Sequence, residues 1–258
     1  MARVLDVNGL RLALGLLTVI PVPAPDGVDR DAARRAMLLA PLALLPITVV
    51  SALAGWGCLL LGVPGFVAGV VTVAVGLLAT GALHADGLAD TADGLGSRRD
   101  PDTSLAIMKR GDIGPMGGAA LVLIYLAQAA AVPALLGRPW GWLQVALLLA
   151  GSRLALAVLT RAGQQPARPD GLGALVVGTV PTPPALVVAL IGWLAIAGSG
   201  WLTGHLIGAL LAVPLGLGAV LWLARTARRR LGGITGDVLG AGVELAATVM
   251  LITASIAW

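Results

Sequence analysis

Seven runs of apolar residues limit what this chain can fold into. They cover residues of about 37–60, 64–83, 116–136, 141–160, 183–198, 202–224 and 239–258. A helix needs about 20 predominantly apolar residues to cross the hydrocarbon core of a bilayer. The composition agrees, because 58% of the 258 residues are hydrophobic and only 12% are charged. We therefore predict an all-α, polytopic integral membrane protein with about seven transmembrane helices, built as one membrane-embedded domain over residues 1–258.

An earlier apolar stretch, residues 9–22, differs from these runs. It is too short for a comfortable crossing, it contains Arg11, and Pro21 lies near its end. Length and charge together favour a position at the membrane surface or a re-entrant turn over a span. We predict an N-terminal interfacial or re-entrant segment.

The basic residues are distributed unevenly between the two sides of the membrane. Of the 17 Lys and Arg residues, all except Arg138 and Arg153 fall in segments that this order of spans puts on the side of the N-terminus. Because cytoplasmic loops carry an excess of Lys and Arg, we predict a cytoplasmic N-terminus and an external C-terminus. The same rule accounts for the net charge of +4, so membrane lipid is an expected partner and nucleic acid is not. The oligomeric state stays open, with a homo-oligomer among the options.

A polar stretch, His84–Gly94, follows the second apolar run directly and holds three of the 13 acidic residues. If the helix of that run continues through it, Asp86, Asp90 and Asp93 stand at i, i+4 and i+7, within an arc of about 60°. Three carboxylates so close repel one another unless a cation neutralises them. Oxygen ligands suit a hard ion such as Mg²⁺, which is commonly shared with substrate phosphates. We predict a metal site here rather than a solvated helix end, and we set His84 aside because it points about 160° away from Asp86.

The rest of this loop, up to the third apolar run, is also polar. Asp100 or Asp102 is expected to cap a short helix that ends at Lys109. A glycine-rich turn then lets backbone N–H groups approach an anion. Lys109 and Arg110 would supply positive charge for a diphosphate, but anchoring by the positive-inside rule explains this pair equally well.

Further polar residues lie in or beside later spans on the same side. Arg153 lies within the fourth apolar run, where an arginine usually faces a partner or a cavity. Asp237 and Glu244 are seven residues apart and share one face of the last helix, so they are candidates for a metal ligand, a base or, for Glu244, a partner of Arg153. Thr235 precedes them in a glycine-rich turn that can approach a phosphate, although Thr235 or Asp237 can equally cap the helix.

These motifs resemble those of the cobalamin synthase family, the adenosylcobinamide-GDP ribazoletransferases. The similar stretches are His84–Gly94, Ile107–Gly114, Gly233–Gly240 with Glu244, and the early Thr18–Pro23. The likeness runs in order from about residue 10 to residue 250, and the acidic motif is its most specific part.

The resemblance implies a Mg²⁺-dependent transferase of the bacterial inner membrane with its active site on the cytoplasmic face. In that reaction α-ribazole, or its 5′-phosphate, attacks the phosphorus bonded to the aminopropanol arm of adenosylcobinamide-GDP. GMP leaves, and adenosylcobalamin or its 5′-phosphate forms. The catalytic and metal-binding residues would be Asp86, Asp90, Asp93 and Asp237. The substrate-binding residues would be Lys109, Arg110, Asp112, Arg153, Thr235 and Glu244.

Two other functions compete with this one. The acidic motif is also similar to a shortened signature of the CDP-alcohol phosphotransferases, which make lipid head groups. The spacing of the aspartates and the absence of Ala-Arg after Asp-Gly argue against that enzyme. A cation-coupled transporter would hold its carboxylates near the midplane between internal repeats, whereas these cluster at one surface and no repeat is visible.

Overall fold

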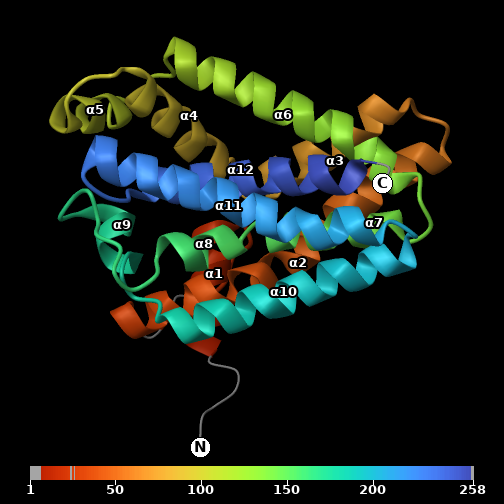
Figure 1. Ribbon diagram of the computed structural model, residues 1–258, viewed down its shortest axis with the longest axis horizontal. Helices are drawn as coiled ribbons and strands as arrows, with labels where there is room; N and C mark the ends of the chain where they lie inside the picture. The colour runs from red at the N-terminus through yellow and green to blue at the C-terminus, as the bar shows by residue number, and fades with distance from the viewer. Residues whose placement is uncertain (1–6, 24, 26, 257–258) are drawn as a thin grey trace, which may run out of the picture.

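The computed structural model describes residues 7–23, 25 and 27–256 as a bundle of helices (Figure 1). Their bounds are α1 (Val7–Leu17), α2 (Arg30–Leu60), α3 (Gly65–Ala79), α4 (Leu83–Gly96), α5 (Pro101–Met108), α6 (Pro115–Leu136), α7 (Gly141–Gly151), α8 (Leu154–Leu159), α9 (Gly171–Val176), α10 (Thr182–Leu202), α11 (Leu206–Leu231) and α12 (Gly236–Ser255). No strand occurs in the described ranges, so the predicted all-α class is confirmed.

Six helical segments are long and apolar enough to cross a membrane: α2, α6, α7 with α8, α10, α11 and α12. The pair α3 and α4 brings the number to seven if it is taken as one broken span, which agrees with the predicted number. The helix of the second apolar run does not continue straight through the acidic motif, although the three aspartates still share one helix, α4. Gly81 and Ala82 adopt left-handed φ angles of 58° and 56°, and α4 leaves α3 at 95°. We count α3 as the membrane part of this pair, because α4 carries the three aspartates.

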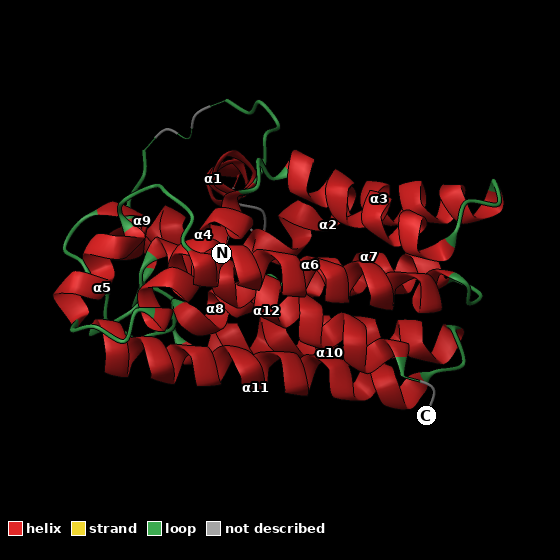
Figure 2. Cartoon of the chain, turned by 90° about the horizontal axis from the view of Figure 1, so that it is seen from above, coloured by secondary structure: helices red, strands yellow, loops and turns green. Residues whose placement is uncertain are grey.

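Helix α1 agrees with the predicted interfacial segment in its length, since 11 residues cannot cross a bilayer. It lies outside the main bundle and contacts α2 (Figure 2). Leu12 and Leu17 of α1 are buried in the apolar core. The backbone N–H of Val19 donates to the carbonyl of Ala79 at 2.9 Å, so the segment after α1 is tied to the end of α3.

Helix α12 occupies the middle of the bundle and contacts α11, α4, α6, α7 and α8. Its buried residues surround the helix axis rather than forming one stripe, as expected for a helix enclosed by others. Small residues allow this close packing. A Cβ atom on Gly242, for example, would lie 2.5 Å from Leu159 Cδ1. The enclosed position of α12 makes it the common wall of every interior site described below.

The two ends of the bundle differ in their chemistry. Short turns of residues 61–64, 137–140 and 203–205 close one end, where Arg138 donates to the carbonyls of Ala254 and Ser255 at 2.8 and 3.0 Å. The other end carries α5, α9 and the aspartates of α4, and we call it the polar end (Figure 1). The difference between the two ends agrees with the prediction that most charged residues lie on one side of the membrane.

Candidate active site

Helices α4 and α12 approach each other closely at the polar end because glycines face the opposing backbone. A Cβ atom on Gly87 would lie 2.7 Å from the carbonyl oxygen of Asp237, and one on Gly240 would lie 3.1 Å from Cα of His84. A side chain at Gly87 would push the helices apart, and one at Gly240 would require the backbone of α4 to shift by a few tenths of an ångström. The contact brings Asp86 of α4 and Asp237 of α12, 151 residues later in the chain, to the walls of one cavity.

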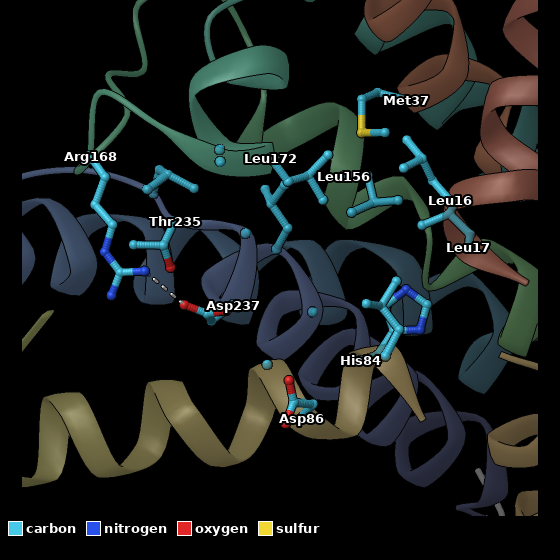
Figure 3. Close-up of a pocket in the computed structure, with 18 of the residues that line it drawn as sticks. Leu16, Leu17, Met37, His84, Asp86, Leu156, Arg168, Leu172, Thr235 and Asp237 are labelled. Carbon is cyan, nitrogen blue, oxygen red and sulfur yellow. Dashed lines mark ion pairs between the residues drawn. The ribbon is translucent and has the colours of Figure 1, made fainter. Parts of the chain in front are cut away.

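The first turn of α12 is shaped by a cap and an ion pair. Thr235 is the N-cap residue, and its hydroxyl oxygen accepts from the backbone N–H of Val238 at 3.2 Å. One oxygen of Asp237 lies 3.8 Å from an Nη atom of Arg168 (Figure 3). The other Nη atom of Arg168 donates to the carbonyl of Leu105 at 2.6 Å, which holds the guanidinium in position.

The cavity has a volume of about 230 Å³. Its polar side is formed by Asp86, Arg168, Thr235 and Asp237, while leucines and a methionine form the opposite side (Figure 3). A predominantly apolar pocket with a few convergent polar groups is typical of a small-molecule site. We name it the site cavity.

The carboxylates beside the site cavity act as one electrostatic cluster. Partial burial, and then the negative charges of Asp237, Asp86 and Asp93, raise the pKa of Asp90 to about 6, while Arg168 lowers it. Like charges held together in this way favour a cation or a cationic substrate group. Among the described residues, no three His, Cys, Asp or Glu side chains have the arrangement of a formed metal site. The donor chemistry nevertheless fits Mg²⁺, which usually takes only one or two carboxylates together with substrate phosphates.

Asp93 is hydrogen-bonded to the start of another helix, α6. Its two carboxylate oxygens accept hydrogen bonds from the backbone N–H groups of Gly114 and Gly117, at 2.7 and 2.8 Å. These N–H groups belong to the start of α6, so Asp93 caps that helix and complements its dipole. The glycine-rich turn was expected to bind an anion of the substrate, but here it binds this carboxylate.

The predicted anion-binding residues of the loop lie away from the polar wall of the site cavity. Asp100 caps α5 by accepting from Thr103 N at 3.0 Å, as predicted. Lys109 pairs with Asp170, on the rim of the site cavity, at 3.6 Å. Arg110 and Asp112 line a separate, open depression beside the start of α6.

Arg153 and Glu244 line another cavity, deeper in the bundle, of about 40 Å³. Gln128 Nε2 donates to Glu244 at 2.9 Å, and an Nη atom of Arg153 donates to the carbonyl of Leu149 at 2.7 Å. The ion pairs found among the described residues do not include one between Arg153 and Glu244, so the two side chains share a cavity without the direct ion pair that was one alternative for Glu244. Asp237 and Glu244 share one face of α12, but Asp237 lines the site cavity and Glu244 lines the deeper one.

Besides Asp170 on its rim, two polar residues of the site cavity were not predicted from the sequence. His84 was set aside by its angle from Asp86, yet both line the cavity, because the cavity extends around the first turn of α4. Arg168 stood out in the sequence only as one more loop charge. Its position between α5 and α12 depends on how the loop after α8 folds back, for which the sequence carries no local signal.

Comparison with known proteins gives matches along nearly the whole chain. A model of the cobalamin-5-phosphate synthase family matches residues 9–255. An adenosylcobinamide-GDP ribazoletransferase of a Nocardioides species is 42% identical over 242 residues, which are 94% of this chain and 96% of that relative. Relatives of the same name from Frankia casuarinae and Corynebacterium efficiens are 39% and 34% identical, over 94% and 97% of this chain and 92% of each relative. No solved structure matches.

Proposed function

Because the chain belongs to the cobalamin-5-phosphate synthase family, we propose that it is an adenosylcobinamide-GDP ribazoletransferase. It transfers the cobinamide phosphate of its donor to α-ribazole, or to α-ribazole 5′-phosphate, and releases GMP. The product is adenosylcobalamin or its 5′-phosphate. The full-length relatives support this activity over the CDP-alcohol phosphotransferase and the transporter.

One observation carries the proposal at the level of residues. Carboxylates from two helices far apart in the chain, Asp86 on α4 and Asp237 on α12, face a cavity that also contains Arg168. Transfer of a phosphoryl group needs positive charge on the diphosphate and a group that accepts a proton from the attacking hydroxyl. The polar wall of the site cavity offers both kinds of group.

Magnesium would be held by Asp86, Asp90 and Asp237 together with the diphosphate of the donor. When bound, the ion would neutralise charge on the diphosphate and offset the repulsion among the three carboxylates. We leave Asp93 out of this set because its carboxylate is hydrogen-bonded at the start of α6.

The residues of the chain then divide the remaining work. Arg168, fixed by its bond to Leu105 and near Asp237, is suited to bind a phosphate oxygen of the leaving GMP. The ribose attacks through a free hydroxyl other than the 5′-hydroxyl, because a 5′-phosphate on the substrate is retained in the product. This ribose oxygen forms a bond to the cobinamide phosphorus, while the bond from that phosphorus to the bridging oxygen breaks. The bridging oxygen leaves with GMP, and a nearby carboxylate takes the proton of the attacking ribose hydroxyl.

We also propose that the enzyme lies in the bacterial inner membrane with the polar end in the cytoplasm. The excess of basic residues at this end supports the orientation. Exposed apolar side chains on α10, among them Leu186, Leu190 and Leu194, support contact with lipid.

The test is to incubate the purified protein with adenosylcobinamide-GDP, α-ribazole and Mg²⁺, and to measure GMP and the corrinoid product. We expect GMP release that requires both substrates and stops when EDTA removes the metal. Asp237→Asn should lower kcat/KM by about 100-fold or more, whereas Asp102→Asn, at an exposed position of α5, should not change it. Equal activity in Asp237→Asn and Asp102→Asn would show that the site cavity is not the place of the reaction.

A further inference from the structure

The site cavity has an apolar side that transfer of a diphosphate does not require. This side is built from four helices, and its members are Leu16, Leu17, Met37, Leu156 and Leu172. Leu16, Leu17, Met37 and Leu156 lie across the cavity from Arg168 and Asp237, and Leu172 lies between them and Thr235 (Figure 3). An apolar wall beside a charged one suits a ligand with the same division, namely a flat, weakly polar ring joined to a sugar.

His84 is the polar group of this apolar side. Its side chain is only 2% exposed, and neither ring nitrogen has a hydrogen-bond partner among the described residues. Leaving a buried polar atom without a partner costs about 1–3 kcal/mol. Both ring nitrogens are shielded from the adjoining cavity, so the ring has to turn to meet a ligand there, and a bond to that ligand would supply the missing partner. A neutral imidazole offers one N–H donor and one acceptor nitrogen.

The volume limits which part of the substrates can enter. A cavity of about 150 Å³ inside a protein binds benzene, and the site cavity measures about 230 Å³. A fused two-ring base fits this space. The corrin ring of the donor is several times larger than such a base, so only its phosphate-bearing arm can reach the polar side.

We propose that the apolar side of the site cavity is the nucleoside subsite, where leucines and Met37 enclose the benzimidazole base of α-ribazole and His84 hydrogen-bonds to it. The base has one ring nitrogen that is free to accept from the His84 N–H, and a ribose hydroxyl can donate to the other imidazole nitrogen. A base held here turns its ribose towards Asp86 and Asp237. This assignment rests on the proposed function.

The experiment measures KM separately for α-ribazole and for adenosylcobinamide-GDP with the full-length protein. His84→Phe keeps a flat ring but removes both polar atoms, so KM for α-ribazole should rise about tenfold. The KM for the donor should change by less than about twofold, because a lost nucleoside contact affects only nucleoside binding. His84→Gln, which keeps a donor and an acceptor, should recover part of the affinity.

Gln144→Leu is the matched control. Gln144 is also fully buried, and its side-chain amide has no partner among the described residues, but it lies on α7 outside the site cavity. Both KM values should stay unchanged in this variant. Leu172→Phe narrows the apolar side and should raise KM more for dimethylbenzimidazole riboside than for unsubstituted benzimidazole riboside.

The outcomes separate the two proposals. If the wild-type protein releases GMP but His84→Phe alters only the KM of the donor, the nucleoside subsite is wrong and the proposed function stands. If the wild-type protein releases no GMP, the proposed function fails. Calorimetric binding of α-ribazole alone then decides the subsite, which requires weaker binding in His84→Phe than in Gln144→Leu. Equal binding in these two variants overturns it.

Discussion

The structure predicts that neutralising two neighbouring aspartates of α4 has different effects, one on stability and the other on turnover. Asp93 caps α6 through two backbone N–H groups, whereas the charge of Asp90 is opposed by three other carboxylates. Asp93→Asn should therefore lower stability, and Asp90→Asn should lower turnover without a loss of stability. The sequence alone gives these two residues the same role.

The expected size follows from the hydrogen bonds of Asp93. Asparagine keeps one acceptor oxygen but turns an NH₂ group towards the second backbone N–H, so one charge-assisted bond of about 1.5–3 kcal/mol is lost. The loss of charge at the start of α6 adds about 0.3–1 kcal/mol. The total of about 2–4 kcal/mol corresponds to a fall in Tm of roughly 5–15 °C for a protein of this size.

The assay is thermal unfolding of each purified variant in detergent, followed by the rate of GMP release well below the transition. Asp102→Asn on α5 is the control for removal of an acidic side chain at the polar end. An unchanged Tm in Asp93→Asn, with activity lost and then partly restored by high Mg²⁺, would refute the capping role. Asp93 would in that case rejoin the metal ligands predicted from the sequence.

Three further predictions test other parts of the molecule. A cysteine at Ser97 should stay unlabelled by an impermeant thiol reagent in intact cells while one at Gly137 is labelled, and the reverse pattern would invert the topology. In metal-free protein the pKa of Asp90 is raised from its ordinary value of 3.8 to about 6. Between these two pH values the folded state binds more protons than the unfolded state, so the stability of the protein falls as the pH rises. The difference in Tm between pH 5 and pH 7 should therefore be smaller in Asp90→Asn than in the wild-type protein. Glu244→Met should destabilise the folded protein by a few kcal/mol, because it leaves the buried charge of Arg153 without a neighbouring opposite charge. The double variant Arg153→Met/Glu244→Met should recover the lost Tm, and the absence of recovery would show that the two residues act independently.

Much of the fold could be predicted from local features. The lengths of the apolar runs determine which segments can cross a membrane, and the distribution of basic residues separates the two ends of the bundle. The cap of α5 at Asp100 follows from its position just before Pro101, where the side chain can reach a free backbone N–H. The spacing of the aspartates follows from the helical repeat. All these features concern one helix at a time.

Only the tertiary structure decided which side chains share a site. The bend at Gly81 and Ala82 turns α4 away from α3, and glycine contacts then seat α4 against α12. Side chains close in helical angle, such as Asp90 and Asp93, are thereby given different partners, and His84 joins a cavity that its angle had excluded. The physical reason is that close packing selects helix partners through the shapes of both surfaces. The periodicity of one helix describes only its own surface and not the surface of the helix that packs against it.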